Sequence, residues 1–194
     1  MKRIVISIAL CFAILFGASF ALNETAQKNW NKDHLWLMQT ILPGSTDFVK
    51  VSYDGEDANI RDIHKAENGF VIQTVTYGYA GEIVVSVAVN NDGFVTGIVV
   101  EEAHETYGLG SRILNDYVFL SQFLNGTGSF EVATQGADAF SGATAAAETE
   151  GEAVAVDGIS GATVSSKAVV RCVNSAIAYV TGADAVSAAT SWGG

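Results

Sequence analysis

The chain has 194 residues, a formal net charge of −11 at pH 7 and 49% hydrophobic residues. That length and apolar content predict one domain with a real core and exclude a disordered chain. The negative charge argues against binding to nucleic acid or docking on anionic lipid, because both attract basic surfaces. Cys11 and Cys172 lie in different apolar segments, so neither a disulfide framework nor a metal-ligand spacing is expected.

The N-terminal stretch from Ile4 to Leu22 is uncharged and follows Lys2 and Arg3. It is long enough to cross a bilayer, and the basic pair before it predicts a cytoplasmic N-terminus with the rest of the chain outside. A cleaved signal peptide is the alternative, because residues 19–21, Ser-Phe-Ala, resemble a cleavage site. Residues 1–22 are therefore expected to be a membrane anchor or a signal peptide, and both export the remainder.

A connecting helix is predicted over residues 23–45, ending at the Pro43-Gly44 pair. Turn residues then separate five apolar, β-branched runs, which predict strands at Phe48–Tyr53, Ile60–Lys65, Phe70–Tyr77, Ile83–Val89 and Phe94–Val100. The run 83–89 is nearly all apolar and is expected to be buried on both faces. The sequence Asn-Asp-Gly at 91–93 predicts a tight hairpin turn.

Helical spacing returns in the second half of the chain. Ser111 to Leu124 is predicted to be one helix, with an apolar face made of Ile113, Leu114, Tyr117, Val118, Leu120 and Phe123. A short strand at Ala153–Val156 precedes a final helix, whose buried face is predicted to hold Val169, Val173, Ala176, Ile177 and Val180. Antiparallel strands with packed helices indicate the α+β class. The main domain is expected over residues 46–181, with a flexible tail at 182–194.

The sharpest chemical signal lies between the last strand and the last helix, at residues 157–167, Asp-Gly-Ile-Ser-Gly-Ala-Thr-Val-Ser-Ser-Lys. Gly158 and Gly161 allow the positive φ of a tight turn. Thr163 is expected at the helix N-terminus, where free backbone N–H groups and the helix dipole favour an anion. Nearby hydroxyls, including that of Ser160, and the charge of Lys167 suit a phosphate. An ordinary N-cap is the alternative on residue type alone.

The pattern Asp-x-x-Ser-Gly-Ala-Thr at 157–163 resembles the flavinylation motif of the FMN-binding domain family. Members serve in ion-translocating redox complexes of the Rnf and sodium-pumping NADH:quinone oxidoreductase types. The resemblance implies that a flavin transferase joins FMN to Thr163 through a phosphoester. It also implies that Asp157, Ser160, Gly161, Ala162 and Lys167 surround the attachment point.

A second resemblance covers residues 105–110, Glu-Thr-Tyr-Gly-Leu-Gly, which match the family's Glu-Thr-Pro-Gly-Leu-Gly box except that Tyr107 replaces proline. Small residues allow the backbone to approach a flat ring closely, so this turn is expected to lie against the flavin. Tyr107 is expected either to stack on the ring or to point to solvent. The box adds the following residues to the candidate site: Glu105, Thr106, Gly108, Leu109 and Gly110.

The attachment motif occurs twice, because residues 138–144 read Asp-Ala-Phe-Ser-Gly-Ala-Thr. Three carboxylates follow this first copy, at Glu148, Glu150 and Glu152, and they would repel a phosphate. No apolar helical stripe follows it either. Thr144 is therefore predicted to be an unmodified loop residue, and Thr163 to be the attachment site.

No acid–base pair or nucleophile constellation stands out in the sequence, and His104 has no visible partner. The resemblance implies an electron-carrying subunit with covalent FMN, anchored in the cell membrane and assembled with other membrane subunits, and such a subunit needs no acid–base pair. One alternative is a freestanding exported flavoprotein that relays electrons to an outside acceptor. The other is a non-redox binding or structural domain in which both motifs are plain turns.

Overall fold

The computed structural model describes residue 32 and residues 34–133 and 153–182. The predictions about Ile4–Leu22, Thr144 and residues 183–194 therefore lie outside the described residues. Among the helices that are described, none combines the length and the apolar character needed to cross a bilayer. The chain divides into two compact units at residues 37 and 38, and the architecture below is that of the second unit.

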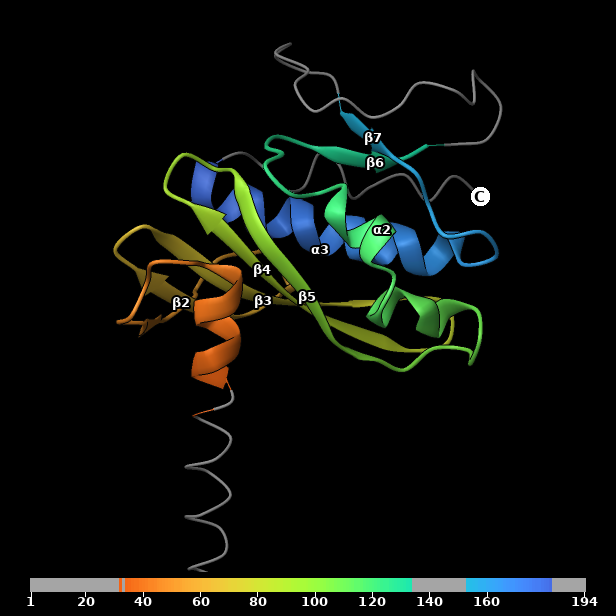
Figure 1. The fold of residues 1–194 in the computed structure, drawn as a ribbon, viewed down its shortest axis with the longest axis horizontal. Coiled ribbons are helices and arrows are strands. Elements are labelled where there is room, and N and C mark those ends of the chain that lie inside the picture. The colour runs from red at the N-terminus through yellow and green to blue at the C-terminus, as the bar shows by residue number, and fades with distance from the viewer. Residues whose placement is uncertain (1–31, 33, 134–152, 183–194) are drawn as a thin grey trace, which may run out of the picture. The chain divides into compact units, whose positions relative to one another are not determined.

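Five antiparallel strands form one sheet in chain order (Figure 1). They are β1 (Val49–Val51), β2 (Ile60–Ala66), β3 (Gly69–Tyr77), β4 (Glu82–Asn90) and β5 (Val95–Ala103). All five predicted strands are present, although β1 is shorter than the predicted Phe48–Tyr53. Gly93 takes a φ of 86° in the turn between β4 and β5, as a tight hairpin requires. The α+β class is confirmed.

Strand β4 is buried on both faces from Ile83 to Val89, as its apolar run predicts. Met38 and Ile41, in the last turn of the helix that precedes β1, and Leu42 just after it are buried outside the core cluster that contains the α3 side chains. Thr96 Oγ1 donates to the carbonyl oxygen of Ile41 at 3.0 Å. A Cβ at Gly97 would lie 2.4 Å from that same oxygen, so only glycine permits this close packing.

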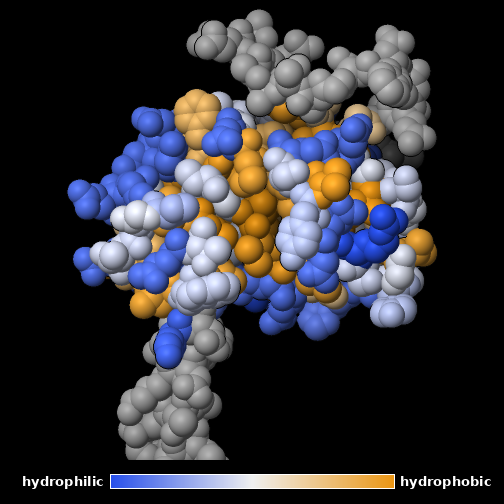
Figure 2. Space-filling model, viewed as in Figure 1, coloured by the Kyte–Doolittle hydropathy of each residue, from blue (hydrophilic) through white to orange (hydrophobic). Residues whose placement is uncertain are grey.

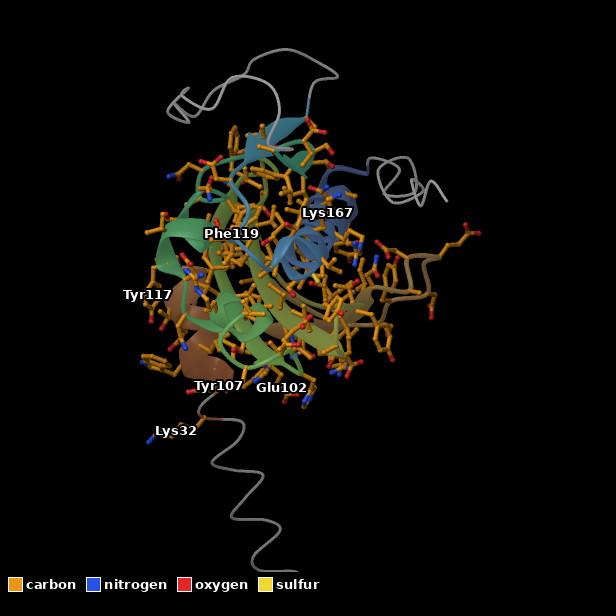
Figure 3. The ribbon with its side chains drawn as sticks, turned by 90° about the vertical axis from the view of Figure 1, so that its right-hand side faces the viewer. Lys32, Glu102, Tyr107, Tyr117, Phe119 and Lys167 are labelled. Atoms are coloured by element: carbon orange, nitrogen blue, oxygen red, sulfur yellow. The ribbon has the colours of Figure 1, made fainter. Side chains whose placement is uncertain are left out.

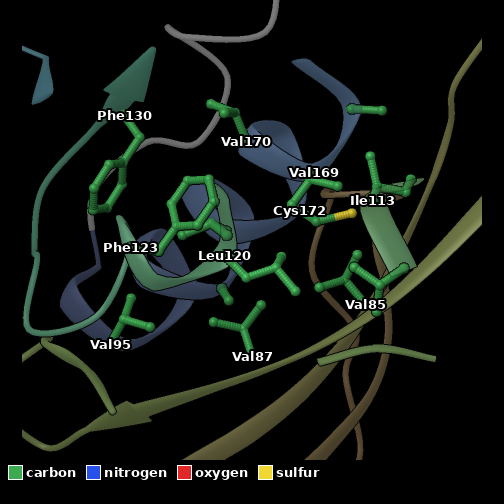
Figure 4. Close-up of a cluster of buried hydrophobic side chains, with 14 of the residues drawn as sticks. Val85, Val87, Val95, Ile113, Leu120, Phe123, Phe130, Val169, Val170 and Cys172 are labelled. Carbon is green, nitrogen blue, oxygen red and sulfur yellow. The ribbon is translucent and has the colours of Figure 1, made fainter. Parts of the chain in front are cut away.

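The last helix, α3 (Thr163–Thr181), packs on β3 and β4 and supplies most of the core on that face. Figure 4 shows its Val169, Val170 and Cys172 facing side chains of the sheet and of α2. The predicted stripe is confirmed, since Val169, Val173, Ala176 and Ile177 are buried, while Val180 is only partly so. The helix ends at Gly182, whose φ of 71° is a left-handed C-cap.

The single helix predicted over Ser111–Leu124 is wrong. The chain forms a 3-10 helix, η1 (Gly110–Leu114), and then a separate short helix, α2 (Tyr117–Ser121). The break occurs because Asp116 caps α2, its carboxylate accepting a hydrogen bond from Phe119 N at 3.1 Å. Tyr117 and Val118, predicted to be buried, are 76% and 79% exposed, and Phe119 is buried instead.

Figure 2 shows that apolar side chains remain open on the face that carries α2 and β5. They form a strip between hydrophilic flanks. The exposure of Val118 and the partial exposure of Phe94 and Leu124 agree with incomplete covering of the core.

A second, two-stranded sheet joins β6 (Phe130–Val132) to β7 (Val154–Val156) in parallel. The sequence predicted β7 but not β6. Asn174 of α3 fixes β6, because its side-chain amide donates to Phe130 O and accepts from Phe130 N, both at 2.9 Å. Phe130 also meets Phe123 edge to face, with ring centroids 5.2 Å apart. This sheet delivers the chain to the turn that precedes α3.

Burial raises the pKa of the Cys172 thiol from 9.0 to about 12. We predict that a Cys11→Ala variant, in which Cys172 is the sole thiol, resists alkylation at pH 8 until the chain is unfolded in urea. Because the folded state holds the thiol proton more tightly, unfolding free energy should fall as pH rises from 9 toward 12. Rapid labelling of the folded protein, measured by mass spectrometry, would contradict this burial.

Candidate functional site

The turn that joins β7 to α3 is closed by two side chains. The side-chain amide of Gln122 makes two hydrogen bonds to the backbone of Asp157. It accepts one from Asp157 N at 2.8 Å and donates one to Asp157 O at 3.1 Å. The buried Ser166 hydroxyl accepts from Ile159 N and donates to Ala162 O, both at 3.0 Å. The turn therefore has a fixed shape before any ligand binds.

The two glycines of this turn play different parts. Gly161 takes a φ of 79°, in agreement with the prediction. Gly158 does not adopt a positive φ; a Cβ there would lie 2.8 Å from Val132 Cγ1, so its small size serves packing against β6. Gly161 is thus the position where the backbone conformation itself disfavours other residues.

Thr163 is the first residue of α3, and its side chain is exposed. The N-cap position belongs to Ala162, and no side chain caps the helix. The ordinary N-cap alternative is therefore wrong for this helix. Within the described residues, the backbone N–H groups of Thr163, Val164 and Ser165 have no hydrogen-bond acceptor. Unpaired N–H groups at the positive end of a 19-residue helix favour an anion.

Lys167 lies one helical turn after Thr163, so both side chains project from the same exposed side of α3. No carboxylate lies within 4.0 Å of the Lys167 ammonium among residues 34–133 and 153–182. Ser160 and Asp157 are exposed beside it, whereas Ser165 and Ser166 are buried. The exposed groups here are thus a hydroxyl, the carboxylate of Asp157, a cation without a carboxylate partner among these residues, and unpaired N–H groups.

Glu105 holds a neighbouring turn together. Its carboxylate accepts from Tyr79 N at 2.6 Å, from Ala80 N at 3.2 Å and from Thr106 N at 3.3 Å. These bonds tie the β3–β4 turn to the turn after β5. A Cβ at Gly110 would lie 2.6 Å from Glu105 Oε2, so glycine is needed beside the carboxylate. Glu105 thus fixes the backbone of the β3–β4 turn and of the turn that follows β5.

The two sequence motifs meet in space. A Cβ at Gly110 would lie 2.8 Å from Ser165 Oγ, and a Cβ at Gly161 would lie 3.3 Å from Leu109 Cδ2. Gly108, with a φ of 76°, has open space around it. Residues 105–110 and the start of α3 therefore form one surface, although the sequence separates them widely.

Tyr107 is 96% exposed and points to solvent, the second of the two expectations for it. Figure 3 shows Tyr107 and Lys167 projecting from different sides of the end of the domain where α3 begins. The side chain that replaces the family's proline therefore does not lie beside Lys167.

The site carries no acid–base machinery in the described part of the chain. His104 Nε2 lies 3.7 Å from Glu102 Oε2, but both side chains are more than 60% exposed. Arg112 is within 3.6 Å of Asp116. No cluster of metal-ligating side chains occurs among the described residues. The donor set at the start of α3 suits a phosphate group.

We predict that Glu105→Gln lowers the free energy of unfolding by about 1–3 kcal/mol, because the three charge-assisted bonds from backbone N–H groups lose the carboxylate that accepts them. Glu102→Gln is the matched control: its carboxylate is 64% exposed, and it should change stability by less than about 0.5 kcal/mol. Urea unfolding measures both variants. Equal stability of the two would show that Glu105 does not hold the turns.

Known proteins resemble this chain in sequence. Residues 78–178, just over half of the chain, match the model of the FMN-binding domain. The G subunit of the Na(+)-translocating ferredoxin:NAD(+) oxidoreductase complex of Acetobacterium woodii is 33% identical over 110 residues. That alignment covers 56% of this chain and 47% of the relative, so the chain matches about half the length of that protein.

Two solved structures are similar to this chain. The C subunit of the Na(+)-translocating NADH-quinone reductase of Parabacteroides distasonis aligns with a TM-score of 0.50 and 20% identity, covering 71% of this chain and 77% of that one. NqrC of Shewanella oneidensis aligns with a TM-score of 0.45 and 22% identity, covering 67% and 62%. On the match over residues 78–178, the chain belongs to the FMN-binding domain family.

Proposed function

We propose that this chain is an electron-carrying subunit whose FMN is joined covalently, through a phosphoester, to Thr163. The flavin supplies one- and two-electron chemistry when bound, and the protein holds and tunes it. The chain's own residues have simpler tasks. Thr163 provides the oxygen of the ester, the free N–H groups of α3 and Lys167 offset the remaining phosphate charge, and Gly161 keeps the turn open.

The observation that carries the proposal is the state of the α3 N-terminus. A long, well-packed helix begins with an exposed threonine, without a side-chain cap, and with a cation one turn away that has no carboxylate partner among the described residues. A structural N-cap would have closed this end with a hydroxyl or carboxylate. Here the end is left open, as an anion site requires.

The remaining residues of the motif complete the proposed site. Ser160 and Asp157 are exposed at the turn, and Ala162 is buried beneath it, so Ala162 acts through its size. The turn at Thr106, Gly108, Leu109 and Gly110 offers an apolar and backbone surface beside the attachment point. Glu105 fixes that turn from behind.

The membrane context is part of the same proposal. We infer that residues 1–22 anchor the chain in a cell membrane, with the domain on the extracytoplasmic side, where a flavin transferase loads it. The relative from Acetobacterium woodii is named as a subunit of a Na(+)-translocating complex. By that likeness we propose that this chain works with other membrane subunits of an Rnf-type complex.

We predict that Thr163→Ala abolishes covalent flavin and leaves the fold intact, because Thr163 is exposed and caps nothing. The chain is produced in a host with the flavin transferase, and flavin is measured by fluorescence in a denaturing gel. Thr144→Ala is the matched control and should retain one flavin per chain. Loss of flavin in the Thr144 variant alone would move the attachment site to the first copy of the motif.

We also predict that Lys167→Glu lowers flavin loading several-fold while the urea midpoint changes little, because Lys167 is exposed and makes no ion pair with a described residue. Lys32→Glu makes the same change in net charge elsewhere and should load normally. Loading is measured as the ratio of modified to unmodified intact mass. Equal loading of the two variants would remove the electrostatic role of Lys167.

A further inference from the structure

Of the seven lysine and arginine side chains among the described residues, three are paired with carboxylates, and the four that are not include the two on α3. Three basic side chains outside α3 lie within 4.0 Å of carboxylates, in the pairs Lys50–Asp62, Arg61–Glu82 and Arg112–Asp116. Lys65 lies over the ring of Phe70. Arg171 and Lys167 have no such carboxylate within the described residues. Two neighbouring cations left without carboxylate partners indicate a site for an external negative charge.

Arg171 is held in place without being neutralised. Its Nη2 donates to Tyr77 O at 2.8 Å, and Nε and Nη2 lie 3.4 and 3.3 Å from Thr76 Oγ1. These acceptors are neutral oxygens at the end of β3. The remaining nitrogen, Nη1, has no acceptor among the described residues. The half-buried guanidinium is therefore fixed in direction by neutral oxygens alone.

Helical periodicity relates Arg171 to the attachment point. Thr163, Lys167 and Arg171 follow one another at spacings of four, which places them along one side of α3. Arg171 is two turns from Thr163, about 12 Å along the helix axis. Val164, 40% exposed, lies seven positions before Arg171 on the same side and offers an apolar surface between them.

We propose that Arg171 is a positioning residue for the flavin ring, an inference that rests on the proposed attachment of FMN at Thr163. With the phosphate held at the helix start beside Lys167, a ribityl chain directed along α3 would bring the ring toward the Arg171 guanidinium, which would hold its edge. Reduction of the ring by two electrons and one proton leaves it with one added negative charge. A fixed cation at its edge stabilises that charge and raises the reduction potential.

The turn at residues 105–110 lies against a different side of α3 from the side that carries Lys167 and Arg171. Ser165, which lies beside Gly110, is displaced around the helix from Lys167 and Arg171. The ring thus has an apolar and backbone boundary on one side and cations on the other. The positive charge of Arg171 then stabilises the reduced, negatively charged ring more than the neutral oxidised ring.

The test uses the full-length flavinylated chain and compares Arg171→Gln, Arg171→Lys and Arg61→Gln. Arg61→Gln removes the same charge from an arginine that is already paired with Glu82. Intact mass first establishes one flavin per chain, and a spectroelectrochemical titration with dithionite then gives the two-electron potential at low and at high salt. A wild-type chain without flavin at the first step would refute the proposed function itself.

We expect Arg171→Gln to lose at least tenfold in the equilibrium constant for reduction, a potential about 30 mV more negative. Arg171→Lys should recover most of that loss, and Arg61→Gln should have the potential of the wild type. High salt should reduce the difference in potential between Arg171→Gln and the wild type, because salt screens the charge. An unchanged potential in Arg171→Gln overturns the proposal. An equal shift of the potential in the Gln and Lys variants also overturns it, because the effect would then come from side-chain packing and not from charge. Failure of a folded Arg171→Gln chain to acquire flavin overturns it too, because Arg171 would then act in maturation.

Discussion

The packing of α3 against β3 and β4 is the contact on which the rest of the domain depends. It buries Val169, Val173 and Ile177 and fixes the direction of the helix relative to the sheet. Because the helix axis is fixed by apolar packing, its first turn needs no side-chain cap to stay in place. The start of α3 is therefore free to present unpaired N–H groups and an exposed threonine.

The surroundings of that helix start are held by polar side chains that act on backbone. Gln122 and Ser166 fix the turn before the helix, and Glu105 fixes the two turns beside it. None of these groups needs to touch a ligand in order to matter. They hold the backbone under the exposed side chains of Thr163 and Lys167 in a fixed shape, and a group bound there would need such a support for a defined orientation.

Much of the fold was predictable because the physical signal was local. Alternating β-branched runs predicted the five strands, and a 3.6-residue period predicted α3. The break in the helix predicted over Ser111–Leu124 could not be predicted from periodicity, because Asp116 caps α2 and so interrupts the helix. Strand β6 was missed because its pairing with β7 and its fixing by Asn174 depend on distant segments. For the site, sequence located the helix start, whereas the hydrogen bonds of Gln122 to the turn and the bonding of Arg171 to neutral oxygens became evident only in three dimensions.

We propose that the side-chain oxygen of one threonine, at the start of α3, carries a flavin nucleotide. Peptide mapping by mass spectrometry of the chain made in its native host tests it most directly, after flavin fluorescence in a denaturing gel. We expect one FMN phosphoester per chain, on the peptide that contains Thr163. An unmodified Thr163 peptide from a chain that is otherwise intact would contradict it.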